Sequence, residues 1–186
     1  MKISIKKLLK KQKARVAVIH ATGIVNKGKD TRVYKLIEEV SQLMQLEFTP
    51  DSIANHNLIA PWKVIYEEYG KKPTKYKTNV EELMKQALKG KVPNKTKLAN
   101  ICNYISLKHI IPVSCYGDKV DIEHFGIHDV SASSENVIIV IHGLYPVTNI
   151  ELKKAMGDAL ELLATYLIPE ELKFAILNEK TPEVII

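Results

Sequence analysis

The fold of this chain is decided by residues 62–121, which read WKVIYEEYGKKPTKYKTNVEELMKQALKGKVPNKTKLANICNYISLKHIIPVSCYGDKVD. The segment from Thr78 to Glu81 has the pattern of a capping box, which predicts the start of an amphipathic helix. Gly90 ends that helix, and Thr96 begins a second one. Pro112 prevents helix soon afterwards. We therefore expect a basic loop, two packed helices and a turn in this order.

The rest of the chain alternates apolar strands with amphipathic helices. Residues 14–19 and 137–141 are β-branched runs that predict buried strands, the second at the centre of a sheet. Residues 30–49 and 149–168 predict long helices, and a short helix is expected over 172–177. These elements predict an α/β fold of the α+β type, with a mixed sheet flanked by helices. No repeat or linker divides the chain, so residues 1–186 are expected to form one compact domain.

Composition excludes several classes of protein. No run approaches the roughly 20 apolar residues that span a bilayer, and the basic start lacks the apolar region of a signal peptide. The two cysteines, Cys102 and Cys115, have no metal-ligand spacing and are expected to be free thiols. We expect a cytoplasmic protein that has no membrane partner.

The net charge of +6 is unevenly distributed. Residues 1–15 hold seven bases and no acid, and residues 63–108 hold eleven bases and four acids. Residues 109–186 hold five bases and twelve acids. A basic front half favours a face that attracts a polyanion. The alternative is an ordinary solvated surface in a lysine-rich chain, because only two of the 27 bases are arginine.

The densest lysines surround the loop before the first helix of residues 62–121. They could follow a phosphate backbone, because lysine supplies charge without reading bases. The alternative is again a solvated surface. The RNA-binding candidates are Lys71, Lys72, Lys75, Lys77 and Lys85, with Lys89, Lys91, Lys95 and Lys97 farther along.

Motifs for other chemistry are weak. There is no GxSxG nucleophile elbow and no glycine-rich phosphate loop. His124 and His128 are spaced like a helical metal-binding pair, but Gly126 argues against a helix, and we expect no metal and no cofactor. His142 follows the apolar strand at a position where strand ends often meet a site. Its alternative is a half-exposed histidine of structural value only.

Several short patterns occur together in one order. A Gly-Lys-Lys-Pro-Thr-Lys turn begins at Gly70, and the second helix carries Asn100-Ile-Cys-Asn103-Tyr-Ile-Ser106-Leu before Pro112. This order resembles the editing, tRNA-binding domain of the phenylalanyl-tRNA synthetase beta chain, and most closely its free-standing relatives. The resemblance is best over residues 62–121 and 148–185.

The resemblance implies binding of tRNA or aminoacyl-tRNA, without DNA, and hydrolysis of a wrongly attached amino acid. Such a site needs a side-chain pocket and a positioned water, and no protein nucleophile. Asn103 and Ser106 have a structural alternative, which is to hydrogen-bond a neighbouring strand and fix the turn at Pro112. The pocket candidates are Asn103, Ser106, Ser114, Tyr116, Asp118 and His142.

The chain also departs from the family pattern. Ser114 stands where synthetase domains place a histidine, and residues 124–143 lack the family's two Gly-Glu pairs. Glu135 is the nearest counterpart of the glutamate that would bind a tyrosine hydroxyl. The leading hypothesis is therefore deacylation of mischarged tRNA in trans. The alternatives are a non-catalytic module that binds an amino acid or RNA, and a hydrolase of another small ester or amide.

Overall fold

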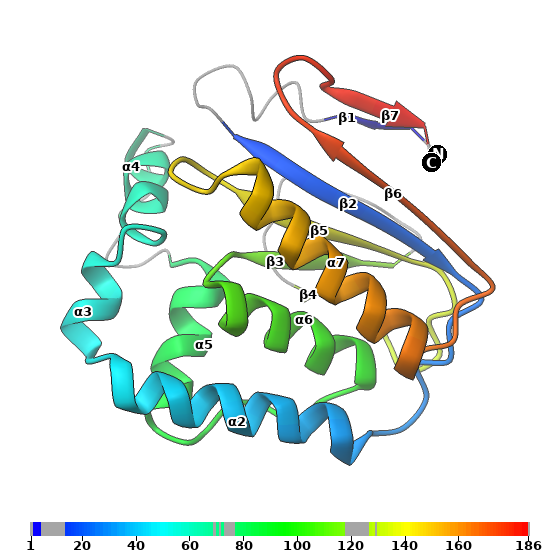
Figure 1. Cartoon of the computed structure of the whole chain (residues 1–186), viewed down its shortest axis with the longest axis horizontal. Coiled ribbons are helices and arrows are strands. Elements are labelled where there is room, and N and C mark those ends of the chain that lie inside the picture. The colour runs from blue at the N-terminus through cyan, green and yellow to red at the C-terminus, as the bar shows by residue number, and fades with distance from the viewer. Residues whose placement is uncertain are drawn as a thin grey trace.

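A layer of helices packs against a central β-sheet in the computed structural model of the chain (Figure 1). The structure describes residues 2–4, 14–68, 70, 72, 77–117, 127–128 and 130–185. In chain order the elements are β1 (Lys2–Ser4), β2 (Arg15–Thr22), α2 (Thr31–Glu47), α3 (Pro50–Asn55), α4 (Ala60–Glu68), α5 (Asn79–Leu88), α6 (Lys97–His109), β3 (Val113–Tyr116), β4 (Ile127–His128), β5 (Val137–Gly143), α7 (Asn149–Tyr166), β6 (Glu171–Leu177) and β7 (Glu183–Ile185).

The main sheet is built around the apolar strand β5. Its strand order is β4-β3-β5-β2-β6, in which the pairs β3–β5, β5–β2 and β2–β6 are antiparallel. β4 pairs in parallel with β3, and β1 and β7 form a separate antiparallel pair. The expected mixed sheet, its flanking helices and the central place of residues 137–141 are therefore confirmed.

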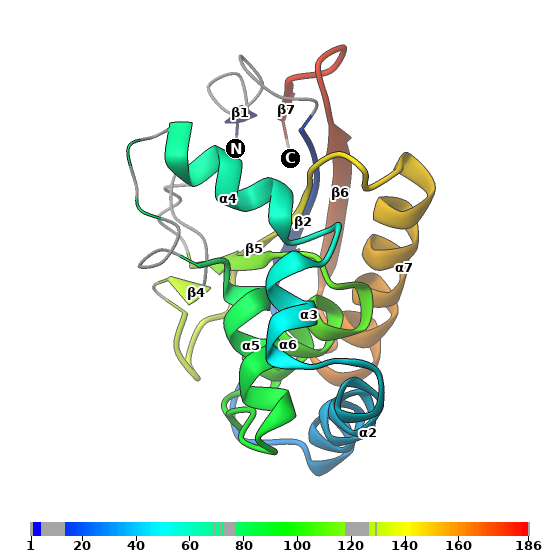
Figure 2. The same ribbon diagram turned by 90° about the vertical axis from the view of Figure 1, so that its left-hand side faces the viewer.

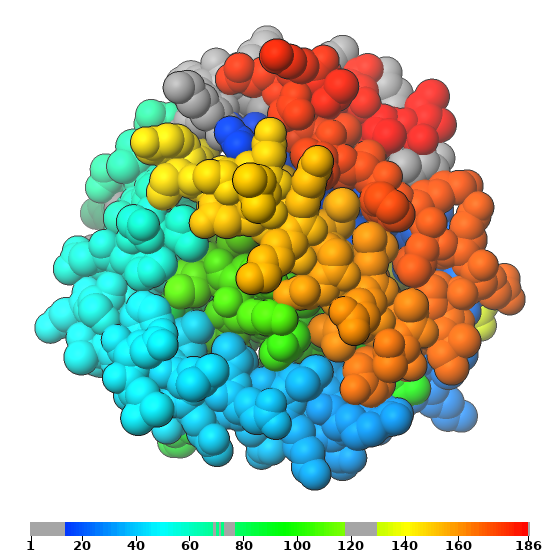
Figure 3. Space-filling view, in the orientation of Figure 1, coloured from blue at the N-terminus to red at the C-terminus, as the bar shows by residue number. Residues whose placement is uncertain are grey.

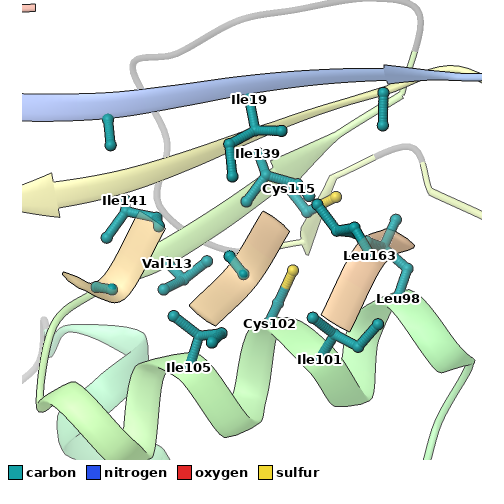
Figure 4. Packing of buried hydrophobic residues seen from close by; sticks show 14 of the residues in the cluster. Ile19, Leu98, Ile101, Cys102, Ile105, Val113, Cys115, Ile139, Ile141 and Leu163 are labelled. Carbon is teal, nitrogen blue, oxygen red and sulfur yellow. The ribbon is translucent and has the colours of Figure 1, made fainter. Parts of the chain in front are cut away.

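The sheet has one face that packs against α6 and α7, and successive residues of a strand alternate between the two faces. We call the face against α6 and α7 the first face and the opposite one the second face. The first face carries the largest hydrophobic cluster, and each buried Ile or Leu side chain in it contributes roughly 1.5–3 kcal/mol. Figure 4 shows residues of this cluster, including Ile19, Leu98, Ile101, Cys102, Ile105, Val113, Cys115, Ile139, Ile141 and Leu163.

The second face is also apolar and buried. Its cluster consists of Val16, Val18, Tyr116, Ile138, Val140 and Leu177, with Val184 of β7 packed against it. His142 and Ser114 point to this face too, because each is separated by an even number of positions from a cluster member on its own strand. Two polar side chains thus lie on an apolar sheet face.

A separate core joins α2, α3 and α5 to α6. Figure 2 shows α5, α3 and α2 grouped together, and in Figure 3 α6 is recessed between α7 and the α2–α3 side of the molecule. The core residues are Ile37, Met44, Ile53, Ile59, Val80, Leu83, Met84, Ala87, Val92 and Leu107. α6 is therefore held on both sides, and its two ends are fixed relative to the sheet.

Polar side chains set the helix starts largely as the sequence predicts. Asp30, Thr78 and Thr96 each accept a hydrogen bond from the first turn of α2, α5 and α6. The sequence also offers Asn149 as the cap of the last long helix, but Thr148 is the cap there, and Glu151 completes a capping box with it. No helix in the described part of the chain is long and apolar enough to cross a membrane.

The prediction of a short helix over residues 172–177 is wrong. These residues belong to β6, which pairs with β2 from Val16 opposite Leu177 to Thr22 opposite Glu171. Seven residues form only about two helical turns, which are marginal in isolation. Pairing with the otherwise open edge of β2 satisfies the same backbone groups and buries Leu177.

Candidate functional site

Ser114 and His142 form a buried polar pair at the ends of two neighbouring strands. Nε2 of His142 lies 3.0 Å from Oγ of Ser114. The backbone N–H of His142 donates to the carbonyl of Pro112 over 2.9 Å, which extends the β3–β5 ladder by one step. Ser114 is 0% and His142 2% exposed. The alternative of a half-exposed His142 is therefore wrong.

Burial fixes the charge of His142. Removal from water lowers the pKa of its imidazole from 6.5 to about 3, so the ring is neutral at neutral pH. The rings of His142 and Trp62 lie in a T-shaped, edge-to-face arrangement, with ring centroids 6.4 Å apart and an interplanar angle of 85°. Trp62 is itself buried on α4 with Ile65 and Leu144. The polar pair thus lies between the sheet and α4.

Tyr116 lies two residues beyond Ser114 and therefore on the same face of the sheet. It is 1% exposed and packs in the second-face cluster with Val18 and Ile138. Three of the six pocket candidates, Ser114, Tyr116 and His142, are therefore neighbours on one face. Asp118 lies outside the described residues.

The two candidates on α6 lie on the opposite side of the sheet. The hydroxyl of Ser106 donates to the carbonyl of Ile111 over 2.8 Å, which fixes the turn before Pro112. Asn103 is 7% exposed on the same helix. α6 packs on the first face, so the sheet separates both residues from Ser114 and His142. The geometry of Ser106 supports its structural alternative.

The five lysines that were predicted to bind RNA divide into three groups. Lys72 and Lys77 are exposed to solvent, whereas Lys71 and Lys75 lie outside the described residues. Lys85 is ion-paired at 2.6 Å with Glu81, whose side chain is almost fully buried. A lysine held in this way is less available to a phosphate than a fully exposed one.

Two contacts bring the start of α5 to the polar pair. The hydroxyl of Tyr66 on α4 lies 3.4 Å from the carbonyl of Lys77, to which it donates. The side-chain amide of Asn79 donates to the carbonyl of Val113 over 2.6 Å, directly before Ser114 in the chain. Burial raises the pKa of the Tyr66 hydroxyl to about 12, so this donor is retained across the physiological range.

We call this region the α4–β3 corner, defined by Trp62, Tyr66, Lys77, Asn79, Ser114 and His142. Sequence reasoning did not single out Trp62 as part of it. The available signal was its helical spacing with Ile65 and Tyr66, which predicts a buried side of α4. The spacing alone does not predict which strand packs against that side of α4.

Metal and thiol chemistry find no support in the part of the chain that the structure describes. No group of three or more His, Cys, Asp and Glu side chains is close enough there to hold a metal ion. His124 lies outside that part, and the side chain of His128 is not described. Cys102 and Cys115 are buried free thiols, and burial raises the pKa of Cys115, which disfavours the nucleophilic thiolate.

Comparison of the chain with protein-family models, curated proteins and solved structures finds no significant match.

Proposed function

We propose that the protein binds tRNA or aminoacyl-tRNA, with the acylated end at the α4–β3 corner, as a cytoplasmic factor in translation. One observation carries the proposal. Residues that the sequence singled out separately, Lys77 and the polar pair Ser114–His142, share one corner. The side chain of Lys77 is exposed and offers a cation to a phosphate at this corner.

The chemistry of the corner favours binding over hydrolysis by His142. An efficient general base has a pKa near the working pH, and the pKa of His142 is about 3. Both members of the pair are also shielded from solvent. The burial of this pair thus argues against hydrolysis by it, and the second candidate function is a module that binds an amino acid or RNA without cleaving an ester.

Two measurements test the proposal. Binding of tyrosine-charged and uncharged tRNA-Phe is compared at equal salt concentration, because phosphate contacts make the affinity strongly salt-dependent. Tighter binding of the charged form is expected if the corner holds the acyl end. Ester cleavage is followed on the same charged tRNA and on other aminoacyl-tRNAs, and cleavage above the uncatalysed rate would favour the deacylase over the binding module.

A matched pair of variants locates the contact. Lys72→Glu with Lys77→Glu changes two exposed bases next to the corner, and Lys153→Glu with Lys154→Glu changes two exposed bases on α7. The first variant is expected to weaken binding of charged tRNA by about tenfold or more, and the second by much less. If wild type binds charged and uncharged tRNA with equal affinity, the acyl end does not bind at the corner.

A further inference from the structure

A second basic region is assembled from two segments that lie far apart in the sequence. Residues 24–35 and 89–97 together hold eight bases and one acid. The backbone N–H of Leu98 donates to the side-chain oxygen of Asn26 over 3.0 Å, and the hydroxyl of Tyr34 donates to the carbonyl of Val92 over 3.2 Å. The ammonium of Lys97 lies 3.3 Å from the carbonyl of Val25. The two segments are thus one continuous surface, which we call the α2–α6 surface.

Most of its positive charge is uncompensated. Its one acid, Asp30, is held by Arg32 at 2.8 Å, and this guanidinium lowers the pKa of the carboxyl to about 2. Within the described chain, no carboxylate lies within 4.0 Å of the other bases of the surface. Six of them are exposed: Lys27, Lys29, Lys35, Lys89, Lys91 and Lys95. The nearest acids along α2 are Glu38 and Glu39.

The directions of two helices add to the positive electrostatic potential of this surface. α2 begins at Thr31 and α6 at Lys97, so the N-terminal ends of two helices of 17 and 13 residues open at the surface (Figure 1). Each such end carries a partial positive charge. The side chains of Asp30, Thr96 and Asn26 already satisfy N–H groups there, so the helix ends strengthen the field without forming an anion pocket.

We infer that the α2–α6 surface binds the phosphate backbone of an RNA duplex. Six of its seven lysines are exposed point charges, which hold phosphates but do not read bases. Single-stranded RNA is usually held on exposed aromatic rings. Here the Tyr34 hydroxyl is bonded to Val92, and the ring of Tyr166 lies beneath Arg32, 5.0 Å from its guanidinium carbon. No stacking platform is therefore offered by the described residues of the surface.

An anionic membrane is the less suitable partner. Peripheral membrane surfaces combine basic residues with exposed aromatic or long aliphatic side chains that enter the lipid. Within residues 24–35 and 89–97, Val25 is the large apolar side chain that is exposed, at 51%. The surface thus has enough positive charge to bind an anionic polymer, but it lacks the exposed apolar side chains that would insert into a membrane.

This inference rests on the proposed function and specifies how the RNA is held. α6 connects the two regions: it begins at the α2–α6 surface and leads through Pro112 to Ser114 at the α4–β3 corner. A helix of 13 residues is about 20 Å long. An RNA that contacts both regions therefore needs an unpaired, acylated end that reaches beyond its duplex by on the order of the length of α6 or more, as the unpaired end of the tRNA acceptor stem does.

Direct binding to defined polyanions tests the inference. The probes are a blunt RNA duplex of about 16 base pairs, oligouridine of the same strand length, and vesicles containing phosphatidylserine. Kd is measured for the full chain between about 50 and 200 mM salt. We expect the duplex to bind more tightly than oligouridine and the vesicles not to bind.

Variants in each segment locate the site. Lys27→Glu with Lys29→Glu and Lys91→Glu with Lys95→Glu each remove two exposed bases, and Lys153→Glu with Lys154→Glu is the matched control on α7. Each of the first two is expected to weaken duplex binding by tenfold or more and to reduce the salt slope by about 2, because each phosphate contact contributes about 1. The control is expected to leave the slope unchanged. Circular dichroism and thermal melting confirm that each variant is folded.

The outcomes separate this inference from the proposed function. Duplex binding that is unchanged in both test variants, or preference for oligouridine or vesicles, overturns the inference and leaves binding at the corner intact. Loss of duplex binding in the test variants, with equal affinity of the wild type for charged and uncharged tRNA, supports the inference and removes the acyl end from the corner. Absence of any RNA binding by wild type at low salt refutes both.

Discussion

His142→Gln is expected to flatten the pH dependence of stability. The folded state holds His142 with a pKa of about 3, whereas the unfolded chain holds it near 6.5. Below about pH 6.5 the unfolded state therefore binds a proton that the folded state does not bind. The free energy of unfolding contributed by this residue is present above pH 6.5 and is lost as the pH falls towards 3. The loss is up to about 1.4 kcal/mol per pH unit, or about 2 kcal/mol between about pH 7 and pH 5.

Urea unfolding of wild type and variant at both pH values measures the effect. Glutamine keeps a polar side chain that can bond the Ser114 hydroxyl but does not titrate. The pKa of His20, His56 and His109 is also lowered by burial, but these residues are present in both proteins, and their contribution cancels in the difference. His56→Gln is the control, since His56 is only half buried and should give a smaller change. If the stability difference between wild type and His142→Gln is the same at both pH values, the conclusion that His142 is buried and neutral in the folded protein is refuted.

Three other changes test the fold around the two regions. Ser114→Ala should cost about 1–3 kcal/mol of unfolding free energy, measured with urea, because it removes the hydrogen bond to the buried His142 ring; an unchanged value would mean that the bond contributes nothing. Asn26→Ala should cost a similar amount, because it removes bonds to Leu98 and Ser131, with the exposed Asn57→Ala as control. Ile168→Gly should raise the free energy of unfolding by roughly 1 kcal/mol, because Ile168 is 70% exposed and its left-handed φ of 48° strains a residue that has a Cβ. A lower free energy of unfolding would contradict this strain.

The elements could be predicted where local patterns agree with the tertiary structure. The capping side chains at Thr78 and Thr96 act within one helical turn, so the sequence alone contains the whole interaction. The strand over residues 137–141 is so apolar that only a central position suits it. Residues 171–177 differ because the edge of β2 decides their conformation, and that edge lies some 150 residues earlier in the chain.

The candidate site was only partly predictable for the same reason. Ser114 and Tyr116 share a face by the two-residue period of a strand, so one implies the other. The pairing of Ser114 with His142 depends on the register of β3 against β5, and the union of residues 24–35 with 89–97 depends on Asn26 reaching the start of α6. Neither register nor a buried amide contact leaves a periodic signal in the sequence.

The state of His142 also constrains any hydrolysis at the α4–β3 corner. A base with a pKa of about 3 is fully deprotonated throughout the physiological range, so its titration cannot shape the rate there. If the protein cleaves aminoacyl esters, the rate after subtraction of the uncatalysed reaction should show no inflection near pH 6.5. An inflection between about pH 6 and 7 that disappears in His142→Gln would mean that His142 meets water and substrate during the reaction. The buried pair would then be a closed form of an active site, and the binding module would no longer be the better account of the corner.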